Sequence, residues 1–173
     1  MEKNKEENKR EEESQAWNIS KDYVHDLIMA RLTDIEKHRS LAIFGYSTLE
    51  HDLFVNNPNL RTRSRRGALS RMIDSMKSLI YFSTFSLKNP DHLKKFEVFL
   101  SRLRTIESKS NNLFHIKYRG NKITELKIHE NLMEKVMSEL SEMTNKIVCL
   151  LNESGIIFAR HEVKDFKKSV TDF

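Results

Sequence analysis

The chain has 173 residues, with 30 Lys and Arg against 25 Asp and Glu, four Gly, two Pro and one Cys. This length fits one domain, or one domain with a tail, and is sufficient for a hydrophobic core without disulfides. The single cysteine, Cys149, cannot form an internal disulfide, and no apolar run approaches the roughly 18–20 residues of a membrane span. We therefore expect a cytoplasmic protein, or a virion-internal one if the source is viral, with no membrane partner.

The four glycines are far apart in the chain, at positions 45, 67, 120 and 155. Glycine-rich phosphate loops need clustered glycines, because backbone amides must approach the phosphate closely. This spacing excludes such a loop, and the scarcity of Gly and Pro predicts long helices.

The first sixteen residues are highly charged and predict a flexible tail, followed by a single helical domain over 17–173. Ser20 is a candidate N-cap for a first helix that ends at about Asn56, with Gly45 allowing a break into two helices. A basic lead-in at 61–67 precedes a second helix over 68–85. Asn89 and Pro90 then mark the start of a third helix.

Residues 113–128 alternate between apolar and polar side chains, which indicates strands. A hairpin with the loop 120–122 would pair Ile116 with Leu126 and Phe114 with Ile128, placing apolar side chains opposite each other. The alternative is a last helix that begins at about Lys122, after a short extended stretch.

A long C-terminal helix follows, with an apolar heptad pattern interrupted by His129 and a natural stop at Gly155. A short tail helix is expected around Val163, Phe166 and Val170. The predicted fold is mainly α, a bundle of four to five helices with one small β-hairpin near 113–128. The heptad positions predict a homo-oligomer, most simply a dimer; they are Met133, Val136, Leu140, Met143, Ile147 and Leu150.

The positive charge is concentrated in residues 60–119, which hold fourteen basic and four acidic side chains. Clustered Arg and Lys suit the phosphate backbone of DNA or RNA. The lead hypothesis is therefore a non-enzymatic nucleic-acid-binding protein of the regulatory or packaging type. The predicted contact residues are Arg61, Arg63, Arg65, Arg66, Arg71, Lys95, Arg102, Lys109, Lys117 and Arg119.

A basic helix with Lys95, Arg102 and Lys109 on one side, followed by a basic hairpin and a long helix, resembles a winged-helix regulator with a dimerising C-terminal helix. The resemblance implies a DNA-facing helix and a wing. The chain departs from that pattern because the link before the basic helix is about five residues long and no short middle helix is visible.

Arg31 and His38 resemble the Arg–His motif of the HEPN ribonucleases, which are also small helical bundles. The resemblance implies that His38 would act as acid or base on a 2′-hydroxyl while Arg31 holds the phosphate. The residue after the arginine is Leu32, where that motif has a polar residue.

The sequence gives no indication of metal or cofactor binding. The seven histidines show no metal-ligand spacing, so no metal and no cofactor are expected. The alternative to nucleic-acid binding is a helical adaptor, which would bind a protein partner through the heptad positions and the methionine-rich helix faces.

Overall fold

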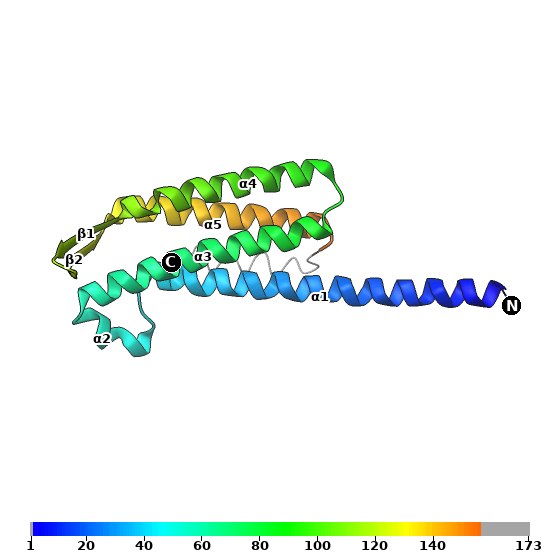
Figure 1. The fold of residues 1–173 in the computed structure, drawn as a ribbon, viewed down its shortest axis with the longest axis horizontal. Coiled ribbons are helices and arrows are strands. Elements are labelled where there is room, and N and C mark those ends of the chain that lie inside the picture. The colour runs from blue at the N-terminus through cyan, green and yellow to red at the C-terminus, as the bar shows by residue number, and fades with distance from the viewer. Residues whose placement is uncertain (1, 157–173) are drawn as a thin grey trace.

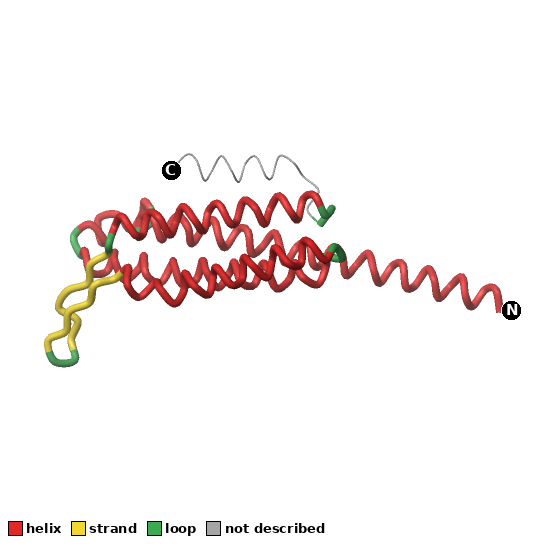
Figure 2. The backbone as a smooth tube through the Cα atoms, turned by 90° about the horizontal axis from the view of Figure 1, so that it is seen from above, coloured by secondary structure: helices red, strands yellow, loops and turns green. Residues whose placement is uncertain are grey.

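The computed structural model describes the backbone of residues 2–156 and the side chains of residues 4–9 and 23–156. Four long helices lie side by side, and a two-stranded antiparallel hairpin projects from one end (Figures 1 and 2). The elements are α1 (Glu2–Phe44), α2 (His51–Val55), α3 (Pro58–Ser86), α4 (Pro90–Lys109), β1 (Phe114–Arg119), β2 (Lys122–Ile128) and α5 (Glu130–Glu153). The predicted mainly-α bundle with a small hairpin is confirmed, and the predicted tail helix falls outside the described residues.

The first helix differs at both ends from the expectation. It already begins at Glu2, so Ser20 is inside the helix and not its N-cap. The segment 2–16, predicted as a tail, forms the part of α1 that extends beyond the other helices (Figure 1). The helix stops at Phe44 because Gly45 takes a positive φ of 79°, which favours glycine. The break at Gly45 is therefore confirmed, and a single helix to Asn56 is wrong.

The basic lead-in predicted at 61–67 is helical, because Pro58 occupies the first turn of α3 and the helix continues from there to Ser86. α3 is also the central element of the core. Its buried side chains include Leu69, Met72, Met76 and Leu79, each at most 1% exposed. The arginines of the basic segment are thus held in fixed directions by a helix.

The hairpin is confirmed over the competing helix. Phe114 lies opposite Ile128 and Ile116 opposite Leu126, as the apolar pairing predicts. The predicted three-residue loop is wrong, because Arg119 pairs with Lys122 and only Gly120 and Asn121 form the turn. A bulge opposite Lys117 and Tyr118 takes up the extra residue and keeps the apolar side chains on one face.

Helix α5 begins after His129, whose side chain accepts a hydrogen bond from the backbone of Leu132. His129 is therefore an N-cap, not a member of the heptad pattern. Gly155 stops the helix as predicted: its N–H donates to Asn152, and the N–H of Ile156 donates to Leu151. The apolar side of α5 completes the core.

Candidate nucleic-acid interface

One end of the bundle carries much of the positive charge. We call residues 44–69 and 104–132 the hairpin end, because they surround the hairpin at the left of Figure 1. They contain ten basic and five acidic side chains. Eight of the basic side chains are exposed: Arg63, Arg66, Arg104, Lys109, Lys117, Arg119, Lys122 and Lys127.

The other two basic side chains, Arg61 and Arg65, are bound to other parts of the bundle, and Arg61 is half-buried while Arg65 is buried. Arg65 is 6% exposed; its Nε donates to the carbonyl of Ala42, and its two Nη atoms donate to the carboxylate of Glu130 at 2.7 and 3.1 Å. Arg61 donates to the carbonyl of Phe44 at 3.0 Å. Both arginines therefore bind the carbonyl end of α1, and all three nitrogens of the Arg65 guanidinium already donate within the protein, so we do not count Arg65 among the cations free to contact a ligand.

Three of the five acids at this end are paired within the protein. Glu130 binds Arg65, Glu107 binds Lys77, and Glu125 binds both Lys117 and Lys127. Hydrogen bonds from Lys127 and then Lys117 lower the pKa of Glu125 to about 2. The same contact raises the pKa of Lys127. The single carboxylate of Glu125 thus offsets part of the charge of the two lysines in the middle of the hairpin.

The tip of the hairpin is not compensated in this way. Arg119 and Lys122 are directly opposite each other across the two strands. Both are exposed, and neither forms an ion pair among the side chains that the structure describes. Two like charges in directly opposite positions destabilise a strand pair. An anion bound between them would remove that repulsion.

The remaining predicted arginines of α3 do not share one narrow face. Arg63, Arg66 and Arg71 are all exposed. Arg66 and Arg71 are five positions apart and so lie about 140° apart around the helix. Arg66 is directed toward the hairpin, with its guanidinium 5.7 Å from the ring centre of Phe114, whereas Arg71 is further along the bundle.

The predicted stripe on α4 extends away from this end. Lys95, Arg102 and Lys109 are exposed, as expected for one side of a surface helix. Lys95 and Lys109 are about 21 Å apart along the helix axis, so only Lys109 belongs to the hairpin end. Glu107, which contacts α3 through Lys77, is about 140° around α4 from Arg102. The stripe and the α3 arginines therefore do not form one continuous surface.

The two ribonuclease-like residues lie on the same side of α1. Arg31, His38 and Gly45 recur every seven residues, and Gly45 faces α3. Both side chains are held locally, because Arg31 pairs with the carboxylate of Asp34 at 3.1 Å and the Nδ1 of His38 is 2.8 Å from the Asp34 carbonyl. Both side chains are half-buried.

The predicted oligomer positions form the core side of α5. Met133, Leu140, Met143, Ile147 and Leu150 are at most 6% exposed in the single chain, and Val136 is half-buried against them. Met72, Met76 and Met137 are buried too. These methionine-rich faces, proposed above for a protein partner, are therefore used within the monomer.

Three exposed basic residues of the hairpin end are missing from the contact residues that the sequence predicted. Lys122 and Lys127 fall just beyond the segment 60–119 that the charge count selected, and Arg104 is absent from the predicted contact residues although it lies within that segment. The turn residues Gly120 and Asn121 were the signal that could have found Lys122, because a two-residue turn, unlike the predicted loop 120–122, places it opposite Arg119. The segment boundary, not the residue chemistry, caused the omission of the two lysines.

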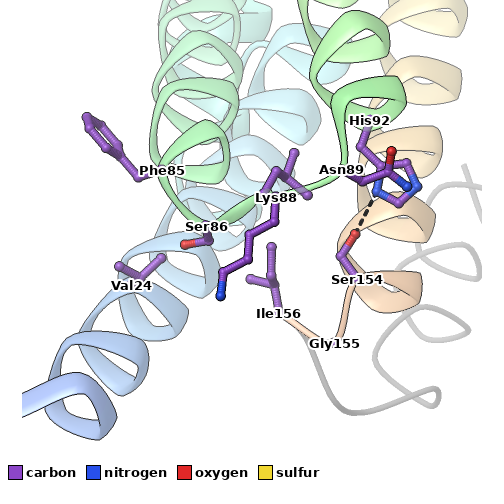
Figure 3. A pocket seen from close by; sticks show the side chains of 10 residues that line it. Val24, Phe85, Ser86, Lys88, Asn89, His92, Ser154, Gly155 and Ile156 are labelled. Atoms are coloured by element: carbon purple, nitrogen blue, oxygen red, sulfur yellow. Dashed lines mark hydrogen bonds between the residues drawn. The ribbon is translucent and has the colours of Figure 1, made fainter. Parts of the chain in front are cut away.

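A pocket of about 690 Å³ lies at the opposite end of the bundle, near the start of α4 (Figure 3). Ser154 and His92 form a hydrogen bond of 3.1 Å at its wall. None of the predicted site residues lines it. Within the described residues no group of three His, Cys, Asp or Glu is placed to hold a metal, and no helix has the length and apolar character to cross a bilayer.

The structure thus defines a four-helix bundle with a projecting basic hairpin. Comparison of the chain with protein families, with curated proteins and with solved structures found no match.

Proposed function

We propose that the protein binds nucleic acid through the hairpin end and does so without catalysis. The observation that carries the proposal is the pair Arg119 and Lys122, two exposed like charges held opposite each other at the hairpin tip. A phosphate group placed between them would turn an unfavourable contact into two favourable ones.

The surrounding cations support the same ligand. Arg63, Arg66, Arg104 and Lys109 are exposed at this end and form no ion pair among the described side chains. A linear polyanion can reach several of these groups at once, whereas a small anion can reach only one or two. Contacts of this kind are to the backbone, so we expect weak sequence preference and strong dependence on salt.

The test is a salt titration of binding to short DNA and RNA duplexes, measured by fluorescence anisotropy. Each lost phosphate contact lowers the slope of log K against log salt by about 0.9. The double variant Arg119→Ala/Lys122→Ala should therefore lower the slope by about 2. Circular dichroism should show an unchanged helical bundle, because both side chains are exposed on the hairpin.

The matched control is Lys94→Ala/Lys95→Ala, which removes two exposed cations at the far end of α4. This variant should bind like the natural protein. If the control loses affinity and the hairpin variant does not, the contact surface is the α4 stripe and the proposal is wrong.

A further inference from the structure

The hairpin end is also where exposed apolar side chains gather. Among the described residues eleven large apolar side chains are exposed. Seven of them belong to this end: Phe44, Leu49, Leu53, Val55, Leu60, Tyr118 and Leu132. Aliphatic side chains gain little from a phosphate backbone, so nucleic-acid binding gives them no role. A concentration of exposed apolar groups commonly marks an interaction site.

The most exposed member, Leu49, belongs to the segment 46–57, which we call the α2 knob. The knob has a small packed interior, in which Tyr46 stacks on Phe54 at 6.4 Å and Arg61 is 5.4 Å from the Tyr46 ring centre. Leu49 is 98% exposed and Leu53 is 57% exposed. Leu49 lies in the 3-10 turn Thr48–Glu50 and Leu53 in the adjoining α2, so both are exposed side chains of the knob.

Charge distinguishes between the partners that could cover these leucines. A second copy docking end to end would bring the exposed cations of the two hairpin ends together, which is unfavourable. The suitable partner is anionic and offers an apolar layer just below its charged surface. A bilayer with anionic headgroups has both properties. The knob's two acids, Glu50 and Asp52, oppose this attraction, but the end as a whole has twice as many basic as acidic groups.

We infer that the hairpin end docks on anionic lipid surfaces, with Leu49 and Leu53 inserted among the acyl chains. Arg119 and Lys122 contact headgroup phosphates, and Tyr118, 64% exposed beside them, occupies the interface. Figure 1 shows the α2 knob and the hairpin projecting from the same end of the bundle. This contact needs no membrane-spanning helix and goes beyond the proposed nucleic-acid binding.

The experiment is co-sedimentation of the full chain with two kinds of vesicle. One kind is pure phosphatidylcholine, and the other is an equimolar mixture of phosphatidylcholine and phosphatidylglycerol. The natural chain should bind the anionic vesicles at least about tenfold more tightly than the neutral ones. Leu49→Ser/Leu53→Ser should lose about tenfold or more of that affinity, because both leucines lie in exposed positions that would enter the acyl region.

The matched control is Tyr81→Ser/Phe85→Ser, which removes two exposed aromatic side chains from the other end of α3. It should bind anionic vesicles as the natural chain does. Equal binding of the natural chain to both vesicle types would overturn the inference, as would full retention of binding by the leucine variant.

Duplex binding separates this inference from the proposed function. The leucine variant should bind duplexes normally, since it keeps every cation. If it loses duplex affinity instead, the leucines contact nucleic acid and the lipid assignment is wrong. Failure of the natural chain to bind any duplex would reject the proposed function and leave the vesicle result standing.

Discussion

Arg65 in α3 and Glu130 at the start of α5 form a two-bond ion pair, although 65 positions separate them in the chain. The guanidinium is buried and the carboxylate is largely exposed. Because Arg65 also binds the Ala42 carbonyl, one side chain connects the end of α1, the start of α3 and the start of α5. This connection fixes the base from which the hairpin projects.

Replacing Arg65 should therefore destabilise the whole bundle. Arg65→Ala leaves the Ala42 carbonyl without its donor and should lower the free energy of unfolding by about 3 kcal/mol. Arg63→Ala, two positions earlier and exposed, should change it by less than about 0.5 kcal/mol. Urea denaturation followed by circular dichroism measures both, and equal effects would show that Arg65 has no special structural role.

The same pair predicts a pH dependence. The hydrogen bond from Arg65 lowers the pKa of Glu130 below its ordinary value. A carboxylate with a lowered folded-state pKa stabilises the fold above its unfolded pKa of about 4.3, and that contribution is lost as the pH falls through the folded value. The stability difference between the natural chain and Glu130→Gln should thus be present at neutral pH and disappear in acid. A difference that persists unchanged in strong acid would contradict this account.

Two glycines should respond to the same substitution in opposite directions. A Cβ on Gly45 would lie 2.7 Å from Arg61 Cγ and 2.8 Å from Arg65 Cγ, at a positive φ. Gly45→Ala should therefore cost about 2 kcal/mol or more. Gly67 is in the exposed part of α3 with nothing within 4 Å of the added carbon, so Gly67→Ala should stabilise by about 0.5–1 kcal/mol. Thermal unfolding measures the change in stability for each variant. If Gly67→Ala destabilised the protein as Gly45→Ala does, this explanation would be refuted.

Sequence periodicity predicted the parts of the fold that depend on local pattern. The start of α4 at Asn89 and Pro90, the stop at Gly155 and the pairing of Ile116 with Leu126 all follow from short-range chemistry. The direction of Arg65 depends on where α1 ends and α5 begins, which no local pattern contains. The sequence therefore predicted a basic segment, and only the tertiary structure separates its structural arginines from its exposed ones.

The heptad pattern of α5 illustrates a similar ambiguity. A row of apolar side chains such as Leu140 and Ile147 fits the interior of a bundle as well as a dimer interface. In the structure α5 packs against α3 and α4 of the same chain, and this row is part of their common core. The periodicity correctly predicted burial, while the partner that provides the burial depended on the rest of the chain.

Removing an acid from the hairpin should strengthen the proposed binding. Glu125 holds Lys117 and Lys127, so Glu125→Gln releases both lysines for phosphate. We expect tighter duplex binding, and a salt slope that is steeper by about 1–2 if one or both lysines contact phosphate. Anisotropy titrations at several salt concentrations test this. Unchanged affinity and slope would mean that the middle of the hairpin does not face the ligand.

The central claim is that the unpaired cations at the hairpin tip contact nucleic acid. The most direct measurement is the salt slope of duplex binding for the natural chain and for Arg119→Ala/Lys122→Ala. The account predicts a measurable slope for the natural chain and one smaller by about 2 for the variant. Equal slopes for the two proteins, or no binding by the natural chain at low salt, would contradict it.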